Sequence, residues 1–272
     1  DKFGDERKTV IQDIEDEIDI EDLIEEETCA FTLSNQGYIK RMPVDTYRTQ
    51  SRGGRGVNAQ NLKEEDYVKS LTIASTHDYM LFFTDLGRVH LRKGYQIPEA
   101  GRTARGTAIV NVLPLEPGES VTAVVVTREF DDNEFLMMVT RKGTVKRIPF
   151  IALKTNRKSG IRAITLDEDD HLINVIRTNG NDNILLATAQ GMAICFNEND
   201  VRPMGRDAAG VRGIMLTGDD YVVGAEKAEE GKTLLTVTVN GYGKRTELSE
   251  YLRTGANGEK CAQSRGGKGL KN

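Results

Sequence analysis

The clearest pattern in the chain is a short apolar run that ends in a polar turn with a glycine, and it occurs five times. The glycines lie 50, 56, 48 and 50 residues apart, at Gly37, Gly87, Gly143, Gly191 and Gly241. Three positions before each stands a small hydroxyl residue, at Ser34, Thr84, Thr140, Thr188 and Thr238. Six positions before stands an apolar residue, at Phe31, Leu81, Met137, Leu185 and Leu235. Because glycine adopts positive φ at little cost, the pattern predicts five β-hairpins.

The spacing of these hairpins also predicts the architecture. An acidic turn leads into a further apolar strand at 65–68, 119–121, 169–172 and 219–222. A period near 50 residues that holds about four strands has the size of a propeller blade. Long stretches with a 3.6-residue apolar period are scarce after residue 28. We therefore expect an all-β fold of about five four-stranded, blade-like units.

A basic, glycine-bearing loop also repeats with this period. The five loops are residues 52–56, 102–106, 157–160, 206–210 and 265–269. In a radial array, equivalent positions fall at equivalent radii, so the loops should line one edge of the disc as a curved positive track. Such a track suits a polyanion that bends, and duplex DNA carries about one charge per 1.7 Å.

The first of these loops lies in the heptad Q-S-R-G-G-R-G, Gln50 to Gly56. Glycine lets a backbone N–H approach an anion, and arginine adds a planar fork of donors that suits phosphate oxygens. Taken alone, the heptad could equally be a flexible loop with incidental arginines. Its near repetition as Q-S-R-G-G-K-G at Gln263 to Gly269 favours phosphate binding. For this second heptad, DNA wrapping and mere repetition of the strand pattern remain open alternatives.

The net charge of −5 hides an asymmetry between a leader and a body. Residues 1–28 carry 13 acidic and 3 basic residues, which leaves 29 acidic and 34 basic residues in the remainder. We expect residues 1–28 to be a solvated helical tail or linker. The alternative is that this acidic segment competes with an anionic ligand for the basic body.

Composition favours a cytoplasmic protein without catalytic chemistry of its own. The three cysteines are unclustered, which is typical of a reducing compartment, and no apolar run approaches the ~18 residues of a membrane span. There is no G-x-x-x-x-G-K-[ST] phosphate loop. The three histidines have no metal-ligand spacing and are expected to be hydrogen-bonded or at the surface, and the acid clusters are expected to be solvated turn caps. We expect no cofactor and no metal in this chain.

Six segments are distinctive: the first heptad, 75–78 (STHD), 98–106 (PEAGRTARG), 204–206 (MGR), 210–213 (GVRG) and 240–246 (NGYGKRT). Together they resemble one known family, the C-terminal domain of the A subunit of bacterial DNA gyrase. The heptad is similar to the "gyrase A box" that separates this family from its topoisomerase IV relatives. Residues 2–9 are similar to the exit from a preceding DNA-cleavage domain, so we expect a leader at 1–28 and a DNA-wrapping domain at 29–272.

The resemblance implies a β-pinwheel, a propeller-like ring whose blades exchange a strand with their neighbours. The family wraps duplex DNA around the rim in a positive sense, so that ATP-driven strand passage introduces negative supercoils. It implies partners in the remainder of the gyrase A subunit and in the gyrase B subunit, in an A2B2 complex associated with the nucleoid, with ATP and Mg bound elsewhere. The family ring usually has six blades, so we expect this domain to lack its last blade.

The expected DNA contacts are Gln50, Ser51, Arg52, Gly53, Gly54, Arg55, Gly56, Arg102, Arg105, Arg157, Lys158, Arg162, Arg206, Arg212, Arg265 and Lys268. The basic pairs 40–41, 146–147 and 244–245, which follow hairpin turns, are expected to be solvated strand ends, and Arg88, Arg92 and Lys93 are secondary candidates. A protein-interaction scaffold with a basic rim is the alternative function. A single-stranded nucleic-acid binder would need aromatic residues among the basic ones, which the heptads lack.

Overall fold

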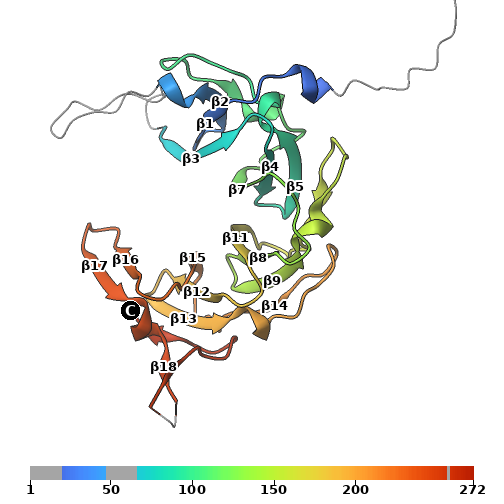
Figure 1. Ribbon diagram of the computed structural model, residues 1–272. Helices are drawn as coiled ribbons and strands as arrows, with labels where there is room; N and C mark the ends of the chain where they lie inside the picture. The colour runs from blue at the N-terminus through green and yellow to red at the C-terminus, as the bar shows by residue number, and fades with distance from the viewer. Residues whose placement is uncertain (1–19, 47–65, 256–257) are drawn as a thin grey trace, which may run out of the picture.

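The structure, a computed structural model, describes residues 20–46, 66–255 and 258–272. In this part of the chain, strands form four four-stranded antiparallel sheets and two two-stranded sheets, and the helices are short 3-10 turns. Figure 1 shows the sheets following one another round an open arc, with β1–β3 at one end and the β16–β17 hairpin at the other. The prediction of an all-β fold built from propeller-like blades is confirmed.

All five predicted hairpins are present. They pair β1 (Thr28–Ser34) with β2 (Tyr38–Pro43), β4 (Tyr79–Thr84) with β5 (Arg88–Lys93), β8 (Phe135–Thr140) with β9 (Thr144–Pro149), β12 (Asn183–Thr188) with β13 (Met192–Asn197), and β16 (Thr233–Val237) with β17 (Gly243–Glu247). Each turn glycine has a φ between 75° and 82°. The repeated hydroxyl accepts a hydrogen bond, 3.1 to 3.3 Å long, from the N–H of the residue after the glycine. The three-residue offset is therefore set by the turn.

A third strand lies beside the first strand of each of four hairpins. These strands are β3 (Val68–Ser75), β7 (Val121–Thr127), β11 (Leu172–Thr178) and β15 (Val222–Lys227). The acidic turns before them cap the hairpin turns, as expected: Asp170 Oδ1 accepts hydrogen bonds from the N–H groups of Lys142 and His171. Asp170 is nevertheless only 5% exposed, so this cap is buried rather than solvated. Since β11 packs against both β7 and β15, the third strands lie on the inner side of the arc.

The outer strand of each of these four sheets comes from the next unit of the chain. These two-residue strands are β6 (Thr107–Ala108), β10 (Ile161–Arg162), β14 (Val211–Arg212) and β20 (Leu270–Lys271), and they pair with β2, β5, β9 and β13 respectively. A final short pair joins β18 (Arg253–Thr254) to β19 (Lys260–Cys261). The exchange of strands between neighbouring blades, which the resemblance implied, is therefore present.

The turn glycine also makes room for the exchanged segment. The carbonyl of Gly87 accepts the N–H groups of Ala163 and Ile164, at 2.8 and 3.1 Å. A Cβ at Gly87 would lie only 2.7 Å from the carbonyl oxygen of Ile164. A larger residue at this position would push the exchanged segment away from the blade.

The hydrophobic core lies between blades. Leu81 and Phe83 of β4 pack with Leu136 and Met138 of the next blade, whereas Phe82 of the same strand packs toward the preceding blade. Alternate side chains of one strand thus enter two different interfaces. Both faces of a blade that lies between two others are buried, so its strands read as continuous apolar runs.

The two ends of the arc carry exposed apolar side chains. Leu71 and Ile73 of β3 are both 54% exposed, and Leu235 and Val237 of β16 are 65% and 61% exposed. The described arc holds four four-stranded sheets and the two two-stranded pairs β16–β17 and β18–β19. The number of blades and the division of the chain at residue 28 stay predictions.

Candidate nucleic-acid interface

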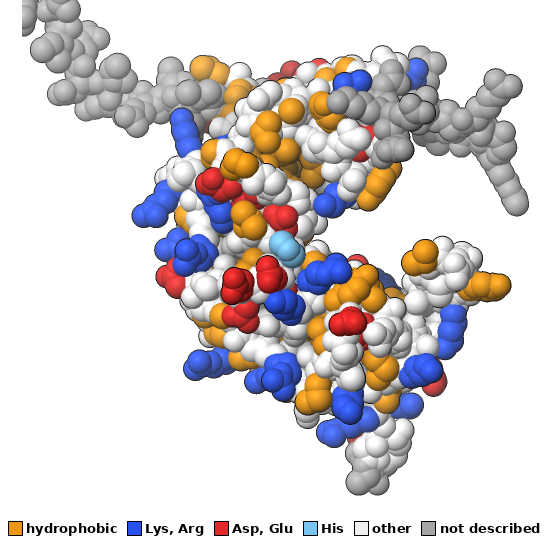
Figure 2. Space-filling model, turned by 180° about the vertical axis from the view of Figure 1, so that it is seen from behind, with side chains coloured by type: hydrophobic (Ala, Val, Ile, Leu, Met, Phe, Trp, Pro, Cys, Tyr) orange, Lys and Arg blue, Asp and Glu red, His pale blue; other side chains and the backbone are white. Residues whose placement is uncertain are grey.

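The exchanged strands carry the described basic loops to the outer edge of the arc. Loop 102–106 leads directly into β6, and loops 157–160, 206–210 and 265–269 lead into β10, β14 and β20. Each loop therefore lies beside the second strand of the hairpin of the preceding unit, β2, β5, β9 or β13, at an equivalent place in successive blades. Figure 2 shows lysine and arginine side chains along the outer edge, with acidic side chains among them.

On the first blade, a buried lysine holds the basic loop by its backbone. Lys40 of β2 is 1% exposed, and its Nζ donates to the carbonyl oxygens of Gly101, Arg102 and Ala104 at 2.9 to 3.0 Å. Burial lowers the pKa of Lys40. The side chains of Arg102 and Arg105 are exposed. The backbone of the loop is thus held by a buried lysine, and its two arginines lie at the surface.

The third blade repeats this arrangement. Lys146 of β9 is fully buried, and its Nζ donates to the carbonyl oxygens of Ala163, Arg206 and Ala208 at 2.7 to 2.9 Å. Burial lowers the pKa of Lys146 to about 8, although Asp207 opposes this shift. Arg206 and its neighbour along the rim, Arg212, are exposed.

The prediction that the basic pairs are solvated strand ends is wrong for 40–41 and 146–147. Lys40 and Lys146 are buried and donate to backbone carbonyls of the basic loops. Arg147 is 4% exposed and forms an ion pair with Glu198, 3.0 Å between Nε and Oε2. The pair at 244–245, on the fifth hairpin, is exposed as expected.

A signal for the buried lysines was present in the sequence. The third residue after each turn glycine is lysine, histidine, lysine, isoleucine and lysine in the five units. Isoleucine at the fourth of these positions indicates that the position faces inward. A lysine that is buried there must find acceptors, as Lys40 and Lys146 do, whereas Lys244 of the fifth hairpin is exposed.

The second blade has His90 at this position and holds its loop differently. His90 is fully buried, and neither ring nitrogen has a hydrogen-bond partner among the described residues, contrary to the expectation that it is hydrogen-bonded or at the surface. Burial and the neighbouring Arg88 lower its pKa to about 4. Gly160 lies against the ring, where a Cβ would come within 2.6 Å of Nδ1.

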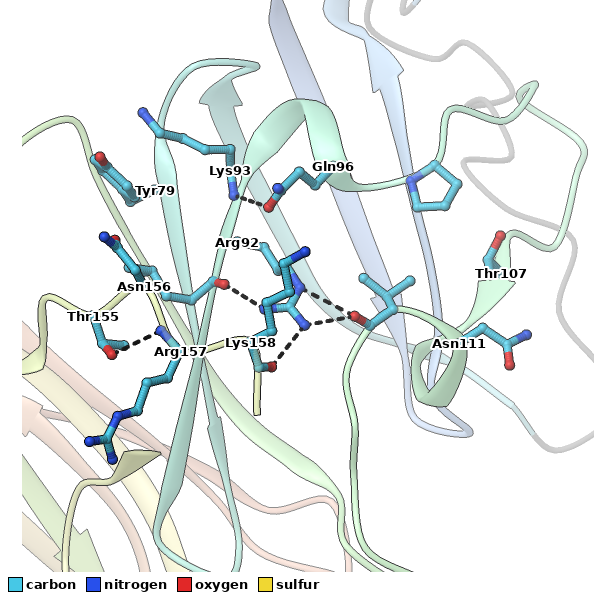
Figure 3. Close-up of a pocket in the computed structure, with 13 residues that line it drawn as sticks. Tyr79, Arg92, Lys93, Gln96, Thr107, Asn111, Thr155, Asn156, Arg157 and Lys158 are labelled. Atoms are coloured by element: carbon cyan, nitrogen blue, oxygen red, sulfur yellow. Dashed lines mark hydrogen bonds between the residues drawn. The ribbon is translucent and has the colours of Figure 1, made fainter. Parts of the chain in front are cut away.

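Two arginines of β5 donate to the loop in place of a lysine. Arg92 donates to the carbonyl oxygens of Val112 and Lys158, both at 3.2 Å, and Arg88 donates to that of Ser159 at 2.8 Å. Figure 3 shows Arg92 directed at both carbonyls. Since its donors are occupied by backbone oxygens, Arg92 has a structural role, and its occupied guanidinium does not favour a DNA contact.

A pocket of about 500 Å³ opens beside these contacts. Its lining includes Lys93, Asn111, Arg157 and Lys158, from three different segments of the chain. In Figure 3 the side chain of Arg157 points away from Arg92, and Arg157, Lys158 and Arg162 are all exposed. These three cations are available to a ligand on the rim.

The second heptad is the rim loop of the fourth blade. The N–H of Gln263 donates to the carbonyl of Cys195 at 2.7 Å, and its side-chain amide donates to that of Tyr251 at 2.9 Å. Arg265 is half-buried, whereas Lys268 is exposed. The heptad therefore docks on its blade as the other loops do, and its two cations lie in different environments.

The first heptad, Gln50 to Gly56, lies outside the described residues. The contribution of these seven residues to DNA binding stays a prediction from the sequence. Of the nine other predicted contacts, eight are exposed on the rim: Arg102, Arg105, Arg157, Lys158, Arg162, Arg206, Arg212 and Lys268.

The described end of the leader is bound to the second blade and is not a solvated tail. Glu21 pairs with Lys93, 2.9 Å between Oε1 and Nζ, and Glu26 pairs with Arg128 at 2.8 Å. The ring of His77 lies 2.8 Å from the carbonyl oxygen of Ile24. The leader thus occupies Lys93, which lines the rim pocket, and Arg128, neither of which belongs to the eight exposed rim cations.

Two further searches of the described residues concern other kinds of site. No group of three His, Cys, Asp or Glu side chains is arranged to hold a metal ion. None of the described helices combines the length and apolar character needed to cross a membrane.

An arc of strand-exchanged blades with cationic loops on its outer edge defines the β-pinwheel class. The chain matches the family "DNA gyrase C-terminal domain, beta-propeller" in five repeats, at residues 30–75, 78–128, 134–179, 182–229 and 232–261, and it belongs to this family. The expected resemblance is confirmed.

Individual relatives agree with this family. The chain is 52% identical over 269 residues to the DNA gyrase A subunit of Clostridium acetobutylicum, and 47% identical over 251 residues to that of Salmonella typhimurium. The matches cover 99% and 92% of this chain but only 31% and 29% of the relatives. The chain therefore spans about a third of the length of the curated relatives it matches.

Solved structures show the same fold. The C-terminal domain of a DNA topoisomerase IV superposes with a TM-score of 0.75 at 26% identity, over 91% of this chain and 73% of that one. A DNA gyrase A C-terminal domain gives 0.69 at 25% identity, over 90% and 76%.

Proposed function

We propose that this chain binds duplex DNA along its outer rim, without sequence preference, and wraps the duplex around the arc. The observation that carries the proposal is the strand exchange, which sets a cationic loop on the outer edge of each of four successive blades. A straight, stiff polyanion could touch only neighbouring loops. A duplex that touches all of them must bend.

The energetics are compatible with this function. Each phosphate neutralised contributes roughly −0.9 to the slope of log K against log salt, so the eight exposed rim cations alone support a slope of about −7. Bending a duplex by 40 to 90° over 20 to 30 base pairs costs roughly 1 to 6 kcal/mol by elastic estimates. Eight charge-assisted phosphate contacts are sufficient to offset a cost of that size.

In the intact enzyme, the wrap would present a neighbouring DNA segment for strand passage. We propose that the chain works as a non-catalytic part of DNA gyrase, joined to the remainder of the A subunit and to the B subunit in an A2B2 complex at the nucleoid. The DNA-cleaving tyrosine, ATP and Mg would belong to the rest of that complex. ATP-driven passage through a positively wrapped segment would then introduce negative supercoils.

The test is the dependence of affinity on duplex length. We expect the affinity for blunt duplexes of unrelated sequence to rise with length until the track is filled, with a steep salt slope. A plateau reached with the shortest duplexes would overturn wrapping and favour the alternative, a protein-interaction scaffold with a local basic patch. The leader makes its ion pairs with Lys93 and Arg128 rather than with the eight exposed rim cations, so these contacts do not support that alternative.

A further inference from the structure

The two cations of the second heptad have different surroundings. Arg265 is half-buried: its Nε donates to the carbonyl oxygen of Asp200 at 2.7 Å, and its Nη1 donates to that of Arg212 at 3.1 Å. Lys268, three residues later, is exposed and has no hydrogen bond or ion pair with the described residues. Both are cationic, but the Arg265 guanidinium already has two backbone partners.

The two partners of Arg265 belong to different blades. Asp200 ends the 3-10 turn η6 (Glu198–Asp200), which follows β13 of the fourth blade. Arg212 lies in β14, the outer strand of the third blade. Two backbone hydrogen bonds flank this bridge: the N–H of Gly266 donates to Gly213 at 2.7 Å, and the N–H of Met215 donates to Gly267 at 2.8 Å. Arg265 therefore lies at the joint between neighbouring blades.

The fourth blade has no lysine at the position that holds the rim loop on the first and third blades, and Arg265 instead donates from the loop to carbonyls outside it. Lys40 and Lys146 hold the loop carbonyls of the first and third blades, and Arg92 does so on the second. The corresponding residue of the fourth blade is Ile194, which is buried and has no donor. The planar fork of an arginine can reach two carbonyls at once, and Arg265 supplies this from the loop itself.

We infer that Arg265 is a positioning residue that ties the fourth blade to the third, and that Lys268 is the residue of this heptad that contacts a DNA phosphodiester. The assignment of Lys268 rests on the proposed function, whereas the tie made by Arg265 does not. In the second heptad, Lys268 thus takes part in wrapping, and Arg265 keeps the rim of the two blades aligned.

The DNA arm of the test measures the salt slope of duplex binding by the whole chain. Lys268→Gln should reduce the slope by about 0.9, and Lys268→Arg should restore it. Arg265→Gln should change the slope by less than about a third of that amount, because its guanidinium is already occupied. A loss of about 0.9 in Arg265→Gln, or an unchanged slope in Lys268→Gln, would overturn the assignment.

The second arm needs no DNA and measures amide hydrogen exchange at Gly266 and Met215. Arg265→Gln should speed exchange of both amides about tenfold, since the charged bridge beside them is lost. Arg265→Lys keeps the charge but lacks the planar guanidinium, so it should also speed exchange at these two amides. Lys268→Gln should leave their exchange unchanged. Unaltered exchange in both Arg265 variants would refute the tie. If the affinity of the unsubstituted chain for duplexes does not depend on salt, the proposed function and the Lys268 contact are both wrong. The hydrogen-exchange measurement still tests the role of Arg265, because it needs no DNA.

Discussion

The ammonium nitrogen of Lys146 lies 2.7 Å from the carbonyl oxygen of Arg206, and this hydrogen bond joins two residues of like charge that are 60 positions apart in the chain. The lysine is buried and holds the loop backbone, while the arginine side chain is exposed on the rim. Lys146 thus positions the loop, and Arg206 is left exposed where it can face an anion.

Replacing Lys146 by methionine should destabilise the fold, although it removes no cation from the surface of the rim. The carbonyls of Ala163, Arg206 and Ala208 would lose the ammonium donor, although that of Ala208 keeps the N–H of Thr165 as a second donor. We expect this loss to cost about 2 to 4 kcal/mol in the free energy of unfolding. Urea denaturation measures this cost. Lys154→Met, at an exposed position, is the control and should change stability by less than about 0.5 kcal/mol. Equal effects of the two substitutions would argue against a buried structural lysine.

The close contact between a turn glycine and the exchanged segment can be tested with two glycines that have similar φ values but different neighbours. Gly87 and Gly191 have φ values of 75° and 81°, so alanine is strained at both. Only at Gly87 would the added Cβ meet the exchanged segment, at 2.7 Å from the Ile164 carbonyl, whereas nothing lies within 4 Å at Gly191. Gly87→Ala should therefore be more destabilising than Gly191→Ala by about 1 to 3 kcal/mol in thermal or urea unfolding. Equal losses would contradict the close contact.

His90 predicts a pH dependence of stability. Its pKa falls from 6.5 to about 4 in the folded chain, so its stabilising contribution is fully present above pH 6.5 and is lost as the pH falls toward 4. Relative to His90→Leu, the unsubstituted chain should lose on the order of 2 kcal/mol between pH 7 and pH 5. The measurement is urea unfolding of both proteins across this range. Parallel pH profiles would show that His90 does not titrate in this window.

The ion pair between Glu21 and Lys93 predicts that the leader slightly weakens DNA binding by electrostatic competition. Glu21 pairs with Lys93 beside the rim pocket, so Glu21→Gln should raise duplex affinity about twofold at low salt and leave it unchanged at high salt. Glu230→Gln, an exposed acid on the fifth hairpin unit, is the control for lost net charge. If the two variants bind alike, the leader does not compete with DNA at this position.

The sequence predicts the hairpins well because a turn with positive φ needs glycine, and the hydroxyl that caps it must stand three residues earlier. The exchanged strands are only two residues long, too short to carry a hydrophobic period, so they were expected only from the family resemblance. The inward direction of Lys40 and Lys146 was missed because a lysine at a strand end is usually solvated. The docked end of the leader was missed because its contacts with Lys93 and Arg128 join distant segments.

Bending of the bound duplex by the rim can be measured by ligating nicked circular DNA at increasing protein concentration and then removing the protein. We predict that the linking number of the closed circles shifts progressively in the positive sense. The double variant Arg52→Ala/Arg55→Ala should abolish the shift and lower affinity only modestly, because the other loops retain their charges. If circles saturated with the unsubstituted chain close with an unchanged linking number, the rim does not wrap the duplex that it binds.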